Sequence, residues 1–192
     1  MKTKFIYFGY IILISLLYFH FGCDQSPVEP EIGENLLANG SFEINNIPTL
    51  NGWRFGNEQL AKLINEAPAI GGNWSLQLTS DWAPTTGYVY TPVVNLKSGD
   101  IVELSAYVRA TSQFGGEGII YLSYNNHRKS ASSNDTVWNK ISIIDTLSLA
   151  PNDTLWVTLS APITEIVPFK QLFDLVKLKK ISKNSRTSYK VI

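Results

Sequence analysis

The chain has 192 residues, 44% of them hydrophobic, which is enough apolar material for one folded domain with appendages. Sixteen basic and sixteen acidic residues give a formal net charge of zero, which argues against a basic nucleic-acid-binding domain. A single cysteine excludes a disulfide within the chain, and with only two histidines it also excludes a four-ligand Cys/His zinc site.

The first 22 residues have the layout of a secretory signal. Two lysines near the start form a short positive region, and the segment 5–21 is almost wholly apolar and carries no acid. A glycine before Cys23 resembles the small residue of a bacterial lipobox, although His20 stands where that pattern usually has leucine. We therefore expect residues 1–22 to be a helical lipoprotein signal peptide, with Cys23 as the lipidated N-terminus of the mature protein.

Two other interpretations of this leader stay open. Its apolar run is near the lower limit of about 17 residues for a membrane span, so it could be an uncleaved anchor, or it could be a signal peptide without lipidation. In each case we expect the rest of the chain to be exported. An acyl chain such as palmitate on Cys23 would hold the protein at the bacterial cell envelope, on the outer membrane, the surface or the periplasmic face. Each buried methylene contributes about 0.8 kcal/mol to this anchoring.

Three regions follow the signal. Residues 23–34 are expected to form a flexible tether, because they contain two prolines, four acids and few apolar side chains. Residues 35–180 show the pattern of a folded domain, in which short runs of alternating residues are separated by Gly, Pro, Asn, Asp and Ser. The polar, basic tail 181–192 is expected to fray.

The clearest predicted strand is 101–110, in which the even-numbered residues are all apolar. Its period of two directs these apolar residues inward and directs Tyr107 and Arg109 outward. The turn sequence at 97–100 indicates that segment 93–96 is a connected neighbour of this strand.

The same alternation occurs in 155–160 and 119–124, and it directs Trp156 and Tyr121 outward. Segment 60–66 has apolar residues at helical spacing, but its context favours an irregular strand. Further strands are expected at 75–79, 87–91, 138–144 and 172–179. Many short strands and little helix signal predict an all-β fold, a two-sheet antiparallel β-sandwich.

Five pieces of the sequence stand in an order and spacing that resemble one family of sandwiches. They are NLLANGSFE at 35–43 with NGW at 51–53, GNWSLQL at 72–78, the turn and strand at 96–110, VWNK at 137–140 and FDLVKL at 173–178. Together they resemble the galactose-binding-like carbohydrate-binding modules, the group that contains families four, nine, sixteen and twenty-two. The resemblance implies a jelly-roll sandwich over residues 35–179, with Trp53 and Trp138 in its core.

The resemblance also implies a structural calcium site that joins the first and last strands. Carried over residue by residue, Glu43 and Asp174 are the side-chain ligands, and carbonyls near Ser41 and Asn73 are candidates to complete the shell of about six to eight oxygens. Leu175 departs from the family pattern, which has a second aspartate there, and this bears on the affinity for the ion. In the alternative interpretation, the two carboxylates only cap strand ends.

Sugar-binding sandwiches combine flat aromatic rings, which match the apolar face of a pyranose, with polar side chains that hydrogen-bond its hydroxyls. We therefore expect the outward residues of the strands to form one row turned to water, which is the candidate ligand site. Its expected members are Tyr107, Arg109, Tyr121, Trp156, Gln77 and, from the rim, Trp82, with Glu103, Tyr88 and Tyr90 as further candidates. The plain alternative is that the tyrosines are ordinary cross-strand pairs.

Together these features predict a non-catalytic carbohydrate-binding domain on a membrane-anchored bacterial lipoprotein. Its ligand would be a polysaccharide or oligosaccharide, with a glycosidase or an uptake system as a candidate partner. The alternative is a structural or adhesive module of the same fold without sugar affinity. An enzyme is disfavoured because no glycosidase-like carboxylate pair is recognisable, and a histidine base would have to be His127 or His20 in the leader.

Overall fold

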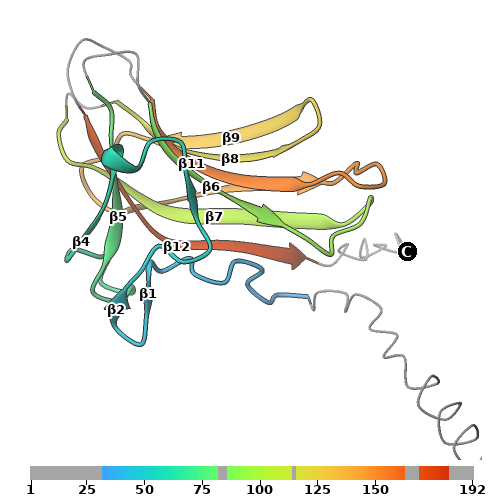
Figure 1. Ribbon diagram of the computed structural model, residues 1–192, viewed down its shortest axis with the longest axis horizontal. Helices are drawn as coiled ribbons and strands as arrows, with labels where there is room; N and C mark the ends of the chain where they lie inside the picture. Colours follow the sequence, from blue (N-terminus) through green and yellow to red (C-terminus); the bar gives the residue numbers. More distant parts are fainter. Residues whose placement is uncertain (1–31, 82–85, 114–115, 163–168, 182–192) are drawn as a thin grey trace, which may run out of the picture.

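The structure, a computed structural model, is a sandwich of two antiparallel sheets (Figure 1). It describes residues 32–81, 86–113, 116–162 and 169–181. The expected signal peptide, Cys23, Trp82 and the tail beyond residue 181 lie outside the described residues.

Each sheet has five strands and is named here after one of its long strands. The β7 sheet contains, in spatial order, β10 (Asn139–Thr146), β7 (Ile101–Ala110), β12 (Lys170–Ile181), β5 (Ser75–Thr79) and β4 (Ala61–Ile64). The β11 sheet contains β3 (Arg54–Phe55), β6 (Gly87–Val93), β11 (Leu155–Ala161), β8 (Gly118–Tyr124) and β9 (His127–Ser133). A separate small hairpin is formed by β1 (Glu43–Ile44) and β2 (Ile47–Pro48).

The prediction of an all-β, two-sheet antiparallel jelly-roll sandwich is confirmed. The described residues contain one helical element, the three-residue 3₁₀ turn η1 (Glu58–Leu60). Across these same residues, no helix has the length and apolar character needed to span a membrane.

One apolar core fills the space between the two sheets. Val102, Leu104 and Val108 of β7 are fully buried, and Val157 and Leu159 of β11 meet them from the other sheet. Burial of each such side chain stabilises the fold by about 1.5–3 kcal/mol. The inward face that alternation predicts is therefore confirmed in both strands. Because the core lies between the sheets, their outward residues lie on opposite sides of the molecule.

The predicted pairing of 93–96 with the strand 101–110 is wrong. The turn itself is present, since the backbone N–H of Lys97 donates to Asp100 Oδ2 at 2.9 Å. However, the segment before this turn ends β6, which belongs to the β11 sheet, whereas β7 belongs to the other sheet. The chain therefore crosses from one sheet to the other at this turn. The residues of the turn do not determine which sheet the next strand joins.

Segment 60–66 combines the two patterns that its sequence shows. Residues Glu58–Leu60 form η1, in which the Asn57 side chain accepts a hydrogen bond from the N–H of Gln59, and Leu60 is buried. Strand β4 follows directly at Ala61 and pairs with β5 at the edge of the β7 sheet. The helical spacing therefore corresponds to the end of the 3₁₀ turn, and the expected strand begins directly after it.

The two tryptophans expected in the core have different environments. Trp53 is 7% exposed, and its indole Nε1 donates to the carbonyl of Asn39 at 2.7 Å, as burial of an indole requires. Trp138 is only partly buried and lies outside the core, with the Arg109 guanidinium 5.6 Å from the ring centroid. The expectation of a core position is confirmed for Trp53 and is wrong for Trp138.

The first described segment runs beside the end of β12 at one corner of the sandwich (Figure 1). Gly33 N–H donates to the carbonyl of Lys180 at 2.9 Å, and Leu36 N–H donates to the carbonyl of Leu178 at 2.8 Å. The Asn35 side chain also accepts from the N–H of Leu178 at 3.0 Å. The chain therefore enters the domain and completes its last strand at the same place.

Candidate functional site

The outward residues expected to form one row are divided between two opposite faces. Tyr121 and Trp156 lie on the outer face of the β11 sheet. Tyr107, Arg109 and Gln77 lie on the outer face of the β7 sheet. The expectation of a single continuous row is therefore wrong, because period-two alternation fixes which side of its own strand a residue takes but not which sheet that strand joins.

The outer face of the β11 sheet carries a continuous group of aromatic rings. The rings of Tyr88 and Tyr90, both from β6, are stacked with centroids 6.1 Å apart. Tyr90 continues to Trp156 of β11, whose ring centroid is 5.6 Å away at an interplanar angle of 59°. Tyr88 is 39% exposed and the other rings are partly exposed, so water reaches the whole group. These rings therefore lie outside the core and form a candidate binding surface.

Strand register brings a fourth ring, Tyr121, into the same surface. Thr158 of β11 pairs with Tyr90 on one side and with Tyr121 on the other, so the three side chains form a straight line across the sheet. Ser123 pairs with Trp156 and adds a hydroxyl beside that ring. The surface therefore alternates flat apolar rings with small hydrogen-bonding groups.

Two arginines complete this surface. The guanidinium carbon of Arg54 lies 5.7 Å from the Trp156 ring centroid, and that of Arg128 lies 3.6 Å from the Tyr121 ring centroid. Such cation–π contacts orient the rings, while the guanidinium edges still offer several N–H donors to a ligand. We call this surface the aromatic face and define it by six residues, Arg54, Tyr88, Tyr90, Tyr121, Arg128 and Trp156.

Both arginines of the aromatic face are absent from the site that the sequence predicts. The signal for Arg54 was its place directly after the buried Trp53, because neighbours on a strand point to opposite sides. Arg128 lies in β9, whose polar sequence gave no strand signal of its own. Tyr88 and Tyr90, named as further candidates, take central places in the group.

On the opposite face, the Arg109 side chain is engaged by its neighbours. Its guanidinium lies 2.5 Å from the Glu66 carboxylate, stacks near Trp138, and leaves 23% of the side chain exposed. Gln77 donates from Nε2 to Thr79 Oγ1 at 3.5 Å within its own strand. Arg109 therefore ties the loop between β4 and β5 to the sheet, which is a structural contact.

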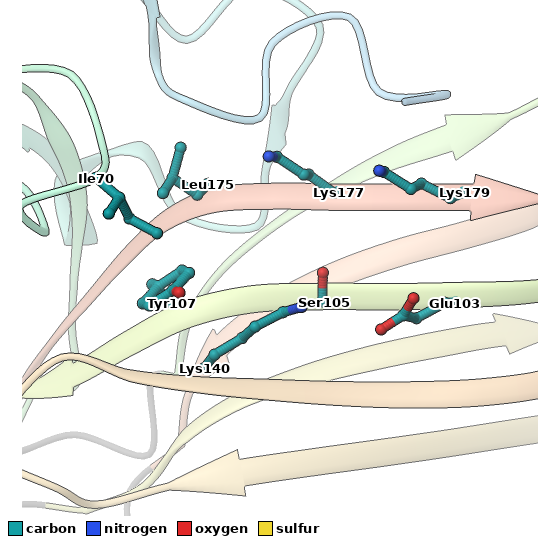
Figure 2. A pocket seen from close by; sticks show the side chains of 8 residues that line it. All are labelled: Ile70, Glu103, Ser105, Tyr107, Lys140, Leu175, Lys177 and Lys179. Carbon is teal, nitrogen blue, oxygen red and sulfur yellow. The ribbon is translucent and has the colours of Figure 1, made fainter. Parts of the chain in front are cut away.

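Tyr107 has a different environment on that face. It pairs across the strands with Asp174 of β12 and with Lys140 of β10. Together with Glu103 of the same strand, it lines a cavity of about 240 Å³ (Figure 2). This cavity is on the other side of the sandwich from the aromatic face.

The two carboxylates expected to hold calcium lie close to one another. A Cβ placed on Gly72 would lie 1.1 Å from Glu43 Oε1, and one placed on Gly71 would lie 2.5 Å from Asp174 Oδ2. The glycine pair therefore allows both carboxylates to approach one turn of the backbone. Glu43 Oε2 also accepts the N–H of Asn73 at 3.0 Å, and Ser41 Oγ donates to the Glu43 carbonyl at 3.1 Å.

Asp174 is fully buried without a positive partner among the described residues. Burial raises the pKa of its carboxyl to about 7; the Leu175 N–H opposes this rise and the nearby charge of Glu43 adds to it. Asp174 Oδ2 has no hydrogen-bond partner, and neither does Ser75 Oγ, which the β5–β12 register places next to it. The unpaired Asp174 and Ser75 oxygens, with the carboxylate of Glu43 close by, are a fitting donor set for a hard cation.

The side-chain part of this donor set is small. Within the described residues there is no group of three or more His, Cys, Asp or Glu side chains placed to hold a metal. Leu175, where the family pattern has aspartate, is bonded through its N–H to Asp174 Oδ1 at 2.6 Å and adds no carboxylate. A bound cation would therefore take most of its oxygens from backbone carbonyls and water.

The sequence was compared with families of known proteins. Residues 34–164 match the model of a family described as a carbohydrate binding domain, CBM_4_9. The chain belongs to this carbohydrate binding domain family. The resemblance inferred from the sequence motifs is thereby confirmed, and the carbohydrate binding domain covers most of the described residues. No curated protein matches the chain.

Solved structures of carbohydrate-binding modules share the fold of this carbohydrate binding domain. A family 16 carbohydrate-binding module is 19% identical with a TM-score of 0.61, and the match covers 76% of this chain and 100% of that one. The CBM22-1 xylan-binding domain of Paenibacillus barcinonensis Xyn10C is 18% identical with a TM-score of 0.55, covering 80% and 98% of the two chains. A family 61 module, solved in complex with β-1,4-galactotriose, is 17% identical with a TM-score of 0.54, covering 77% and 99%.

Proposed function

We propose that the protein binds a polysaccharide or oligosaccharide on its aromatic face and does so without chemical change of the ligand. The observation that carries this proposal is the unbroken group of rings, with Tyr88 to Tyr90 at 6.1 Å and Tyr90 to Trp156 at 5.6 Å. Membership of a carbohydrate binding domain family supports it. So do the xylan-binding and galactotriose-bound modules that share the fold.

The chemistry of the aromatic face suits sugars. The C–H faces of pyranose rings pack on flat aromatic side chains, which removes apolar surface from water. Arg54, Thr158 and Ser123 then offer hydrogen bonds to sugar hydroxyls at the edges of the rings. Because β6, β8 and β11 are paired strands of one sheet, these groups are fixed before binding, which lowers the entropic cost of association.

Binding without hydrolysis follows from the same residues. A glycosidase needs two carboxyl groups about 5 to 9.5 Å apart on either side of the bond that it cleaves. The six residues that define the aromatic face include no carboxylate. A catalytic partner, if there is one, would be another domain or protein that acts on the glycan held here.

Calcium at Glu43 and Asp174 is a second part of the proposal. The unpaired Asp174 Oδ2 and Ser75 Oγ support it, because an oxygen-binding cation would satisfy both. A bound cation would neutralise the two carboxylates and join the β1 hairpin and the β4–β5 loop to β12. Its role would be to stabilise the fold, and it lies apart from the aromatic face.

Lipid attachment at Cys23 is a third part of the proposal. The apolar leader and the small residue before Cys23 support it. Mass spectrometry of the full chain from bacterial envelopes should show an acylated N-terminus at this cysteine. If the wild-type chain keeps residues 1–22 and carries no acyl group, the leader is an uncleaved anchor.

Affinity electrophoresis of the full chain in detergent, run in gels containing xylan or β-1,4-galactan, tests the main proposal. Trp156→Ala should weaken binding about tenfold or more, which corresponds to about 1.4 kcal/mol. Trp138→Ala is the matched control, because it removes a tryptophan from beside Arg109 on the opposite face, outside the cavity that Tyr107 lines. Binding that Trp156→Ala leaves intact would reject the aromatic face. Failure to bind any glycan would favour the structural or adhesive alternative.

A further inference from the structure

The cavity on the outer face of the β7 sheet is chemically divided into two ends. Figure 2 shows Ile70, Leu175 and the Tyr107 ring grouped at one end, with Lys179 and Glu103 toward the other. Lys177 lies between them, and Lys140 extends from β10 across β7 toward Ser105. One end is therefore apolar, and the rest of the cavity is lined by three lysines and one carboxylate.

A break in strand register brings two of these lysines to the surface. Between Asp174 and Lys177, β12 shifts its pairing with β7, and Leu175 takes a left-handed backbone conformation with φ of 49°. After the shift, Lys177 pairs with Ser105 and Lys179 pairs with Glu103. Regular alternation from Asp174 would have directed both lysines into the core.

The lysines of the cavity are not neutralised by neighbours. None of Lys140, Lys177 and Lys179 has an ion-pair partner among the described residues, whereas Lys129 and Lys180 are paired with Asp145 and Asp100. Three ammonium groups face one carboxylate, Glu103, so the cavity attracts anions.

Protection of a sheet edge does not explain Lys177 and Lys179. Exposed lysines often guard edge strands against unwanted pairing. However, this part of β12 pairs with β7 on one side and is bonded by residues 33–36 on the other, so it is not a free edge. Edge protection therefore does not account for these two lysines, which line the cavity.

The shape and chemistry of the cavity favour one class of ligand over others. An inorganic anion would use the lysines but would leave the wall of Tyr107, Leu175 and Ile70 without a role. A neutral sugar would use that wall but would leave three cations unpaired. A sugar that carries a carboxylate uses both ends, because its pyranose face packs on the Tyr107 ring while its carboxylate meets the lysines. The volume of about 240 Å³ is below the range of about 300–1,000 Å³ for drug-sized ligands, so it suits one or two sugar units.

We propose that this cavity is a second saccharide site, separate from the aromatic face, that binds a hexuronate unit of an acidic glycan. Lys140, Lys177 and Lys179 hold the carboxylate, and Tyr107 and Leu175 contact the apolar face of the ring. The class of ligand rests on the proposed carbohydrate-binding function, but the site itself shares no residue with the aromatic face.

Isothermal titration of the full chain in detergent with oligogalacturonate, at low and high salt and with calcium present, tests this proposal. The double variant Lys177→Gln/Lys179→Gln should weaken binding about tenfold or more, and Trp156→Ala should leave it unchanged. Lys170→Gln is the matched control, because this exposed lysine lies at the start of the same strand outside the cavity. High salt should weaken oligogalacturonate binding in the wild type, because the contact depends on charge.

The methyl-esterified oligogalacturonate is the matched ligand, since it keeps the sugar ring and removes the charge. It should bind the cavity at least tenfold more weakly than the free acid. Equal binding of the ester, loss of uronate binding in Trp156→Ala, or no uronate binding while neutral glycans bind would each overturn the second site. The last outcome would leave the proposed function of the aromatic face intact. Equal competition by inorganic phosphate would also overturn it, by showing that the lysines bind anions without selecting a sugar.

Discussion

The two broad faces of the sandwich use the same strand geometry for different surfaces. The aromatic face arises from strict alternation, because Tyr88, Tyr90 and Trp156 occupy regular outward positions of paired strands. The lysine-lined cavity of the β7 sheet instead depends on an irregularity, the register shift at Leu175, and on a loop that brings Ile70 to its rim. A regular strand thus presents an extended flat surface, whereas a bulge and a loop produce a partly open hollow.

Insertion of one glycine between Leu175 and Val176 should have the largest effect. With the bulge at Leu175 kept and one more residue before the regular part of the strand, Lys177 would point into the core and Leu178, now fully buried, would point to solvent. Burial of unpaired lysines and loss of buried leucine contacts should lower the free energy of unfolding by about 4 kcal/mol or more. Chemical denaturation followed by tryptophan fluorescence measures this. Leu175→Gly is the control, because glycine keeps the residue count and adopts φ of 49° readily. An insertion variant as stable as Leu175→Gly would show that the facing of Lys177 and Leu178 does not depend on the residue count of β12.

Asp174→Asn should change the stability of the metal-free domain in a pH-dependent way. The pKa of Asp174 rises from 3.8 to about 7 on folding, so the metal-free wild type loses stability as the pH increases between these values. Above pH 7 the variant should therefore be more stable than the wild type by roughly 2 kcal/mol, measured by thermal unfolding in chelator.

With calcium bound, the wild type should be more stable than Asp174→Asn. Calcium should raise the melting temperature of the wild type but not that of Asp174→Asn. Glu58→Gln, a change of an exposed carboxylate in η1, should respond to calcium as the wild type does. An equal calcium shift in Asp174→Asn would exclude this carboxylate as a ligand.

Asp145→Asn tests a link that holds the two sheets together at one edge. Asp145 lies in β10, and its carboxylate contacts Lys129 at 2.5 Å and His127 at 2.9 Å, both in β9 of the other sheet. Burial raises the pKa of Asp145, but the hydrogen bonds and charges of Lys129 and His127 outweigh burial and leave it below its usual value of 3.8. Its contribution is therefore complete above about pH 4 and is lost as the pH falls through the lowered pKa.

The Asp145→Asn variant should be less stable than the wild type at pH 7 by about 1 kcal/mol, because both partner side chains are partly exposed. The difference should shrink when denaturation is repeated at about pH 3. A difference that stays constant with pH would show that the carboxylate charge is not the source.

Arg54→Ala should have the smallest effect, and only on the aromatic face. Loss of the guanidinium near Trp156 should reduce affinity for a neutral glycan by about two- to fivefold, as for an exposed cation–π contact. Titration calorimetry should show no change in uronate binding. Arg54→Lys keeps the charge without the planar fork, and it should fall between the wild type and Arg54→Ala.

The sequence predicted those features of the fold that depend on local alternation. Strands 75–79 and 101–110 were expected with the bounds that the structure has, because each shows apolar residues at period two and is bounded by turn residues. Strand β9 was missed, since its residues His127–Ser133 form a polar edge strand with little apolar periodicity. The bulge at Leu175 was also missed, because nothing in the local sequence requires a leucine to adopt a positive φ.

The site was harder to predict than the fold, for a physical reason. Trp156 and Tyr107 each follow alternation correctly, yet they lie on opposite faces because sheet membership depends on contacts far apart in the chain. Arg109 looks available in the sequence, but Glu66 reaches it from a separate loop. The motif resemblance predicted that Glu43 and Asp174 lie near one another, and in the structure the two carboxylates are close.

The neighbouring positions of the first described segment and the end of β12 have a mechanical consequence. A pull applied through Gly33 and Ile181 would act first on the few hydrogen bonds that join residues 33–36 to 178–180, and would open them one after another. Attachment through this corner, as the proposed lipid anchor implies, would leave both broad surfaces open to ligand. One molecule could then hold two separate stretches of a branched or mixed polymer at once and act as a clip between them.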